Sequence, residues 1–381
     1  LTEDHPQIDA KQIILPRKSY VLQTSYGAVS SFGFTGTNVH VILEKAPDEL
    51  ASKPRTEAFL ALSGQNRQAL EFNAAQLKHW LEANPEEPAL EIAEQLSCQR
   101  SQQPVRLGRV VKSREELLEV LKQPRPLREV EQEPKIAFLY SGQGSASVGM
   151  GFEFGQRYDV FNEVIEHCHK VLGKSFNLKG RLIGAQEGLL DTRYTQAALL
   201  AFETALTQVW KSVGIEPVAV LGHSLGAFSA AVEAGSLNLD AALHMLVSRG
   251  EHMSNAPAGG MLAIRASVEE IQPFLEKSEL SLTAHNGPAS VVLGGAIDAV
   301  RNFSETCKKQ GFKHQLLDVE RAFHSSLIQD ASRAWAKDIQ SVKFQKPSIP
   351  WVSDSHGKLI ESMSSGDWLS HALKPIQFYS A

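Results

Sequence analysis

The sequence predicts an α/β protein that is built from two or three structural units. Its 381 residues exceed what one hydrophobic core usually supports. A buried apolar strand leads into a sharp turn and a helix over residues 218–232, and a second strand leads into a glycine-rich turn over 135–145. Between residues 261 and 317, strand and helix patterns follow one another in the order βαββαβ. Mixed strands and helices in these orders indicate sheets covered by helices.

Composition and charge argue against several classes of protein. The formal net charge of -5 gives no basic footprint, so we expect no nucleic-acid partner. The three cysteines, Cys98, Cys168 and Cys307, are far apart and odd in number, which is typical of free thiols in a reducing cytosol. His167 and His169 flank Cys168, but neighbouring helical residues point in different directions, so we expect no metal site. Because no apolar run would span a bilayer and no signal peptide opens the chain, we expect a cytoplasmic protein without membrane contact.

The turn at residues 222–226, Gly222-His223-Ser224-Leu225-Gly226, is typical of a nucleophile elbow. Glycines on both sides of the serine allow the strand and the helix to approach closely. This geometry would expose the Ser224 hydroxyl and aim the backbone N–H of Leu225 at a developing oxyanion. The alternative is a plain glycine-rich strand-to-helix turn with a capping serine. The further motifs below favour the elbow.

The N-terminal residues indicate a neighbouring domain. The first residue is Leu rather than Met, so we expect a longer polypeptide. Residues 26–47, from Tyr26-Gly27-Ala28 to Lys45-Ala46-Pro47, resemble the last strands of a β-ketoacyl synthase domain. The resemblance implies that His40 matches a catalytic histidine of that family, but the family's nucleophilic cysteine is absent from this segment. We therefore expect residues 1–50 to be a ketosynthase remnant in which His40 is one polar residue of a strand pair.

Residues 51–134 predict a small α/β unit without a catalytic constellation. Its expected elements are a strand at 59–63, a helix capped by Asn66, a helix at 90–96, a strand at 105–111 and a helix at 115–121. Residues 122–133 carry two prolines and many charges, which is typical of a linker. The unit resembles the adapter between a ketosynthase and an acyltransferase in multidomain synthases.

The remaining residues resemble the malonyl-CoA:acyl carrier protein acyltransferase family. The resemblance rests on the order of the 135–140 strand, the Ser141-Gly142-Gln143-Gly144-Ser145 turn, the Thr195-Gln196-Ala197-Ala198-Leu199 segment and the elbow. It implies an α/β-hydrolase-like large subdomain, residues 135–260 and 321–381. It also implies that Gln143 and the Leu225 N–H form an oxyanion hole, and that Gln196 and His223 lie at the substrate pocket. A family member normally continues with another strand and helix, so either this chain lacks its closing elements or they lie beyond residue 381.

The βαββαβ order over residues 261–320 is the ferredoxin-like pattern. The expected elements are strands at 261–264, 280–284, 290–293 and 313–317, and helices at 268–275 and 299–310. We expect this small subdomain to be inserted into the large one. The cleft between the two would then hold the thioester substrate.

Two further residues match functional positions of the family. The resemblance implies that His324, 100 residues after Ser224, is the catalytic base, with its second ring nitrogen held by a main-chain carbonyl. It implies that Arg249 binds the free carboxylate of a malonyl-type substrate. A guanidinium suits this role because its planar fork matches a carboxylate and keeps its proton. A lone arginine on a helix is otherwise most often a solvated charge.

Two more positions concern the choice of acyl group. Phe323 resembles the residue at this position in polyketide synthase domains that select malonyl. A phenylalanine ring there would fill the space that an α-methyl group needs. Arg321 and Ala227 depart from the family, which usually has histidine and glutamate there. Arg321 is either a solvated cation or a contact for a polar α-substituent such as the hydroxyl of hydroxymalonyl.

The sequence therefore predicts an acyltransferase domain of a modular type I polyketide synthase. Malonyl-CoA is the expected donor, with no bound cofactor, and a phosphopantetheinylated acyl carrier protein is the acceptor. The adjoining ketosynthase is the second expected partner. The alternatives are an acyltransferase for a polar, possibly carrier-bound extender, a serine hydrolase such as a thioesterase, and an inactive docking scaffold. A thioesterase would normally show an acid between serine and histidine in the chain.

Overall fold

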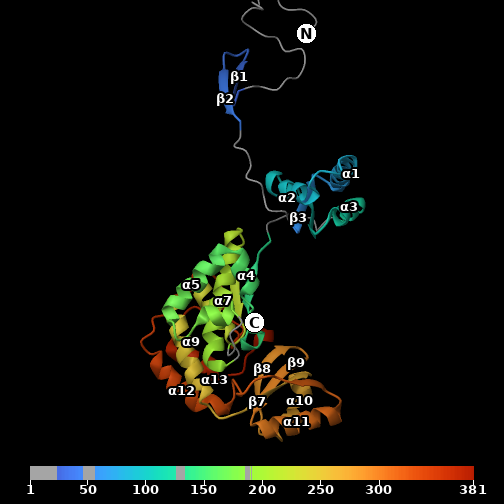
Figure 1. Cartoon of the computed structure of the whole chain (residues 1–381). Coiled ribbons are helices and arrows are strands. Elements are labelled where there is room, and N and C mark those ends of the chain that lie inside the picture. The colour runs from blue at the N-terminus through green and yellow to red at the C-terminus, as the bar shows by residue number, and fades with distance from the viewer. Residues whose placement is uncertain (1–23, 46–55, 126–133, 185–188, 190) are drawn as a thin grey trace, which may run out of the picture. The chain divides into compact units, whose positions relative to one another are not determined.

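The computed structural model describes residues 24–45, 56–125, 134–184, 189 and 191–381. The chain divides into two compact units, Leu1–Glu133 and Pro134–Ala381, which are described separately here (Figure 1). Residues 46–47 of the ketosynthase-like segment and residues 126–133 of the expected linker lie outside the described residues. Within the described residues, no helix has the length and apolar character needed to cross a membrane.

The first unit contains a hairpin that matches the expected strand pair. Strands β1 (Tyr26–Phe32) and β2 (Asn38–Glu44) pair in antiparallel register. His40 lies in β2, exposed, with its Nδ1 2.8 Å from the Ser30 hydroxyl oxygen across the hairpin. Its described contacts are therefore those of a polar residue in a strand pair.

The first unit also contains the small α/β fold predicted for the adapter. Strands β3 (Ala58–Gly64) and β4 (Val105–Val111) pair antiparallel. Three helices accompany them: α1 (Arg67–Ala83), α2 (Ala89–Gln99) and α3 (Arg114–Lys122). Asn66 caps α1 by accepting from the Ala69 N–H at 2.9 Å, which satisfies one free amide of the first helical turn. Buried apolar side chains of both strands and all three helices form one core.

The second unit begins with a three-stranded parallel sheet in the order β11-β6-β5. The strands are β5 (Ala137–Tyr140), β6 (Ala219–Gly222) and β11 (Trp351–Val352). Because the strands are parallel, the loops that follow them lie at the same edge of the sheet. Ligand sites in open α/β sheets lie at this edge.

Helices pack around this sheet and complete the large subdomain. They are α4 (Phe152–Arg157), α5 (Asp159–Leu172), α6 (Leu178–Leu182), α7 (Thr192–Ser212), α8 (Gly226–Glu233), α9 (Leu239–Ser254), α12 (Gln329–Asp338) and α13 (Ser365–Leu373). Figure 1 shows α5, α7 and α9 running beside one another. Helix α7 is buried along most of its length because alanines and leucines cover several of its faces. Aromatic rings from α8 and α13 stack in the core, where the ring centroids of Phe228 and Trp368 lie 4.0 Å apart.

The small subdomain is a four-stranded antiparallel sheet in the order β10-β7-β9-β8. Its elements are β7 (Gly260–Arg265), α10 (Val268–Leu275), β8 (Ser281–Gly287), β9 (Ser290–Gly295), α11 (Ile297–Gln310) and β10 (Lys313–Leu316). This βαββαβ connectivity confirms the predicted ferredoxin-like insertion. The segment after α13 returns to this sheet, since Ile376 exchanges backbone hydrogen bonds with Thr283 and His285 of β8.

The predicted fold class is confirmed, and most differences in the predicted elements concern their ends, while α12 and α13 were not predicted. Strand β5 begins at Ala137 rather than at residue 135, and α11 begins at Ile297 rather than at 299. Strand β8 runs to Gly287, three residues beyond the predicted end, because it continues along β9 as far as the Gly287–Ser290 pair. Helix ends are the least specified part of a sequence pattern, since fraying and caps shift them by one or two residues.

Candidate active site

The glycines at the end of β6 allow the strained turn that carries Ser224. Ser224 has a φ of +53°, the left-handed region that L-residues rarely adopt. A Cβ added to Gly222 would overlap the backbone of Gly226, and one added to Gly226 would lie 2.5 Å from the Tyr140 carbonyl oxygen. Strand, turn and helix α8 can therefore meet this closely only because both positions lack a side chain. The turn has the geometry of a nucleophile elbow.

Ser224 and His324 lie in hydrogen-bond contact although 100 residues separate them in the chain. Ser224 Oγ lies 2.7 Å from His324 Nε2. His324 Nδ1 lies 3.0 Å from the main-chain carbonyl oxygen of Lys374, which can only accept. Nδ1 therefore carries the proton, and Nε2 is free to accept the proton of the serine hydroxyl. The carbonyl takes the place that a carboxylate occupies in a Ser-His-Asp triad.

His324 is held in the neutral form by its surroundings. The residue is 5 % exposed and has a φ of +59°, so its loop is fixed in a sparsely populated conformation. Burial, together with the neighbouring His371, Arg249 and His223, lowers its pKa to about 3, while Asp354 acts in the opposite direction. A neutral imidazole at physiological pH is the form that acts as a general base.

The Ser224–His324 pair opens into a cavity of about 520 Å³ between the large and small subdomains. The large subdomain contributes the turn after β5, the elbow and α9, and the small subdomain contributes β7, β8 and β9. Most of the lining surface is apolar, with a few polar groups directed at one end, which is typical of a small-molecule site. The predicted site residues in its lining are Gln143, His223, Ser224, Leu225, Arg249, Phe323 and His324.

Arg249 is a buried cation in this cavity. It lies on α9, is 3 % exposed and donates from Nη1 to Gln196 Oε1 at 2.7 Å. In the described part of the chain no carboxylate pairs with it, and burial lowers its pKa to about 10. The Nε2 of Gln196, itself fully buried on α7, also lacks a partner among the described residues. A buried charge without a counter-ion is costly, so this arrangement favours an anionic ligand.

Gln143 and Leu225 lie on either side of the cavity near the serine. Gln143 begins the short 3₁₀ helix η1 (Gln143–Ser145) after β5, and its Nε2 lies 3.4 Å from Thr192 Oγ1. Leu225 follows the nucleophile at the start of α8. Both can present an N–H to an oxygen at Ser224, but the side chain of Gln143 is directed at α7 in this structure.

His223 and Phe323 line the cavity from the large subdomain. His223 Nε2 lies 2.8 Å from Asn286 Oδ1 on β8, so this contact ties the elbow to the small subdomain. Phe323 is 8 % exposed and packs in a cluster that includes Met261 and Val292 of the small subdomain. The ring of Phe323 therefore restricts the width of the cavity beside His324.

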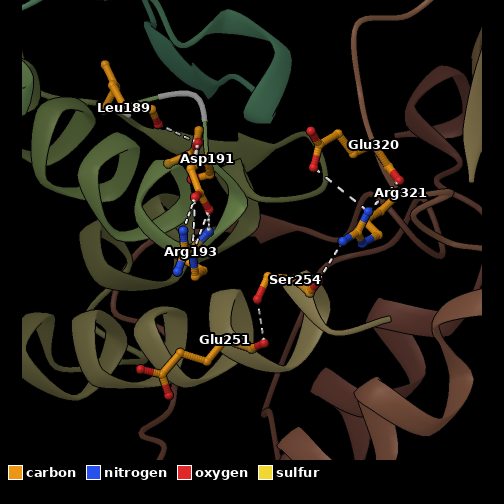
Figure 2. Close-up of polar contacts among 8 residues, drawn as sticks. Leu189, Asp191, Arg193, Glu251, Ser254, Glu320 and Arg321 are labelled. Atoms are coloured by element: carbon orange, nitrogen blue, oxygen red, sulfur yellow. Dashed lines mark hydrogen bonds and ion pairs between the residues drawn. The ribbon is translucent and has the colours of Figure 1, made fainter. Parts of the chain in front are cut away.

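Arg321 does not line the cavity that holds Ser224. Figure 2 shows its guanidinium beside Ser254 and Glu320: it donates to the carbonyl of Ser254 at 2.6 Å and to that of Glu320 at 2.9 Å, and its Nη1 lies 3.8 Å from a carboxylate oxygen of Glu320. Ser254 is the last residue of α9, where free carbonyls attract a cation. Arg321 lines an adjoining hollow instead, together with Asp191 and Arg193. The structure therefore does not bring Arg321 to the α-substituent of a bound acyl group.

Three buried polar residues near the elbow escaped the sequence reasoning. Glu203 on α7 accepts from the Ser141 N–H at 2.8 Å and from Ser229 Oγ at 2.6 Å, so it anchors the turn before Gln143. Asp354 accepts from the Ser224 N–H and lies beside His371. The signal for Asp354 is its place directly after β11, at the same sheet edge as the elbow. Across the described ranges, no group of three or more His, Cys, Asp or Glu side chains is placed to hold a metal ion.

Two family models match the chain. The acyl transferase domain model matches residues 137–378, and the ketoacyl-synthetase C-terminal extension model matches residues 3–107. Polyketide synthase GfsB of Streptomyces halstedii is 33 % identical over 93 % of this chain, which covers 7 % of that protein. The spectinabilin polyketide synthase system protein NorB of Streptomyces orinoci is 34 % identical, also over 93 % of this chain and 18 % of that protein. The chain thus spans less than a fifth of either relative.

Solved structures of acyl transferases are also similar to this chain. The acyl transferase domain of ZmaA is 29 % identical, with a TM-score of 0.76 over 86 % of this chain and 80 % of that one. The acyl transferase domain of SpnD, in complex with 2-(pent-4-yn-1-yl)malonyl, is 27 % identical with a TM-score of 0.76 over 85 % and 80 % of the chains. The malonyl CoA-acyl carrier protein transacylase of Coxiella burnetii is 26 % identical, with a TM-score of 0.59 over 64 % and 81 %. The chain belongs to the acyl transferase domain family of polyketide synthases, with a ketoacyl-synthetase C-terminal extension before the domain.

Proposed function

We propose that this chain transfers a malonyl-type acyl group from a thioester donor, with malonyl-CoA as the expected donor, to an acyl carrier protein in polyketide biosynthesis. The observation that carries the proposal is Arg249, a buried guanidinium in the cavity of Ser224 and His324 for which the described residues supply no carboxylate partner. An acyl group with a free carboxylate would supply the missing anion. A simple acyl group would leave the charge unpaired.

The first half-reaction would form an acyl-serine ester. His324 Nε2 takes the Ser224 hydroxyl proton as Oγ attacks the thioester carbonyl, and the backbone N–H of Leu225 stabilises the oxyanion, joined by the Gln143 side chain once it turns from Thr192 toward the cavity. When the C–S bond breaks, the imidazolium returns its proton to the leaving thiolate. The Ser224–His324 distance of 2.7 Å supports this transfer, since it already equals that of an ordinary hydrogen bond.

The second half-reaction would repeat these steps with a different nucleophile. His324 takes the proton of the carrier protein's phosphopantetheine thiol, the thiolate attacks the ester, and Ser224 leaves with the proton. The acceptor is therefore a phosphopantetheinylated carrier protein, and the expected kinetics are ping-pong. No resident cofactor is needed, because CoA and phosphopantetheine take part as substrate and acceptor. The ketoacyl-synthetase C-terminal extension supports a ketosynthase as neighbour.

Malonyl is the acyl group that the cavity favours. Phe323 narrows the space beside His324, where an α-substituent would lie. Arg321 donates its two hydrogen bonds outside the cavity, so it is not available to a polar α-substituent such as hydroxyl. The names of similar proteins support the malonyl class, since one is a malonyl CoA-acyl carrier protein transacylase and another binds a substituted malonyl.

Intact-protein mass spectrometry tests the proposal. The protein is mixed separately with malonyl-, methylmalonyl-, hydroxymalonyl- and acetyl-CoA, with Ser224→Ala as the control. We expect a malonyl adduct that is absent from Ser224→Ala and is transferred to an added carrier protein. Rapid release of malonate to water without a carrier would instead indicate a hydrolase. A folded protein that forms no adduct with any donor would leave only a docking scaffold.

A further inference from the structure

Asp354 and His371 form a buried polar pair directly behind the nucleophile. Asp354 follows β11 and is 2 % exposed, and His371 lies on α13 and is 7 % exposed. His371 Nε2 lies 3.1 Å and 3.3 Å from the two carboxylate oxygens. The Oδ2 atom of Asp354 also accepts from the backbone N–H of Ser224 at 2.6 Å. A carboxylate that is shielded from water therefore contacts the backbone of the residue with the reacting hydroxyl.

The carboxylate of Asp354 is charged at neutral pH. Burial alone would raise its pKa, but His371 and the Ser224 amide outweigh burial, and the pKa lies below its ordinary value. Removing an ion from water costs several kcal/mol, which the contacts with His371 and Ser224 must offset. A neutral side chain could satisfy one backbone N–H at a lower cost. The charge itself therefore points to a role beyond holding the turn.

The position of the charge fits a transfer that passes through imidazolium. His324 must accept a proton, but its burial and the neighbouring His371, Arg249 and His223 disfavour the cation. Asp354 is the neighbour that favours the cationic form of His324. The Asp354–His371 pair also borders a second hollow of about 490 Å³. The other titratable residues in the lining of this hollow are His356, Lys358, Glu361 and Asp367.

We propose that Asp354, held in place by His371, is a positioning residue for acyl transfer that fixes the strained backbone of Ser224 and electrostatically stabilises the imidazolium form of His324. This inference rests on the proposed acyl transfer at Ser224. Asp354 is not the acid of a Ser-His-Asp triad, because Nδ1 of His324 donates to the Lys374 carbonyl. It acts through the nucleophile's backbone and through space.

Two substitutions of Asp354 separate the charge from the hydrogen bond. Asp354→Asn keeps an oxygen that accepts from the Ser224 N–H but removes the charge, whereas Asp354→Ala removes both. We expect Asp354→Asn to slow acyl-enzyme formation on the order of 10- to 100-fold, the usual size for a partner that acts through another residue. Because Asp354 does not line the substrate cavity, the dissociation constant of the donor stays unchanged. Asp354→Ala is expected to be slower still.

Asp338→Asn is the matched control. Asp338 Oδ2 lies 2.8 Å from His252 Nε2 at the end of α12, so this variant removes the carboxylate of another Asp–His pair in the same subdomain. Its rate should equal that of the wild type. His371 supplies a second test that leaves Asp354 intact: His371→Leu removes the partner that holds Asp354 and should slow the reaction, even though it also removes a group that disfavours the His324 cation, while His371→Gln restores a donor and should recover most of the rate.

Single-turnover quench-flow with malonyl-CoA, read by intact mass at several donor concentrations, gives the rate and the dissociation constant for each variant. Circular dichroism melts identify any variant that does not fold, in which case the His371 pair decides. An Asp354→Asn variant that acylates at the wild-type rate overturns this inference but leaves the proposed function intact. So does a loss that appears only in the donor dissociation constant, or an equal loss in Asp338→Asn. A wild-type protein that forms no acyl-enzyme refutes the proposed function and this inference together.

Discussion

Replacing Arg249 with Met should convert a malonyl-selective site into one that favours acetyl. Methionine fills much of the arginine volume without its charge. The guanidinium is 3 % exposed and has no carboxylate partner in the described part of the chain, so a bound malonyl carboxylate would be its counter-ion. Removing one partner of a buried ion pair costs about 3–5 kcal/mol. At about 1.4 kcal/mol for each factor of ten, malonyl-enzyme formation should slow roughly 10²- to 10⁴-fold.

The assay compares malonyl-CoA with acetyl-CoA in single-turnover acylation. Acetyl transfer should be unchanged or faster in Arg249→Met, because the acetyl group leaves the wild-type cation unpaired. Arg301→Met is the matched control, since Arg301 lies on α11 with a side chain that is 68 % exposed. Equal losses with both donors would refute the reasoning and make Arg249 a structural residue. Undiminished malonyl transfer would show that the carboxylate binds elsewhere.

Two further outcomes follow from the geometry. The lowered pKa of His324, about 3, means that its imidazole stays the neutral base as pH falls, so the rate of malonyl-enzyme formation should be nearly flat between pH 5 and 8. A loss of rate with a midpoint near pH 6.5, the ordinary histidine value, would show that His324 is not shielded. Gly226→Ala should lower the thermal midpoint by the equivalent of about 1–3 kcal/mol, because its Cβ would lie 2.5 Å from the Tyr140 carbonyl oxygen. Gly144→Ala, with open space around the added Cβ, is the control in the same melting experiment, and equal midpoints for the two variants would contradict the close packing of the elbow.

Local patterns were sufficient to predict the small subdomain, whereas the architecture of the large subdomain followed from the family resemblance. The βαββαβ order could be predicted because its elements are short, its two helices are amphipathic and turn residues separate the elements. The elbow could also be predicted from neighbouring residues, because the glycines around Ser224 are required by the close backbone contacts of this turn. Helices α12 and α13 were not predicted. Helix α12 has only two buried residues, Ser332 and Trp335, and its exposed polar residues outnumber them. Few apolar residues therefore mark this helix in the sequence.

The parts of the candidate site that sequence reasoning missed depend on contacts across the chain. Asp354 lies 130 residues from Ser224, and no motif links the two positions. Glu203 looks like an ordinary polar residue of α7 until Ser141 and Ser229 are seen to donate to it. The sequence left two roles open for Arg321, a solvated cation or a contact for a polar α-substituent, because the family usually has histidine at this position. The structure turns it toward the end of α9, since carbonyls without helical partners at a helix C-terminus attract a cation.

The separation of these contacts also explains why the site needs both subdomains. Ser224 extends from the large subdomain, but the carbonyl that holds His324 belongs to Lys374, two residues before Ile376, which pairs with β8 of the small subdomain. His223 makes a second link to β8 through Asn286. A shift of the small subdomain would therefore disturb the orientation of the base as well as the width of the cavity.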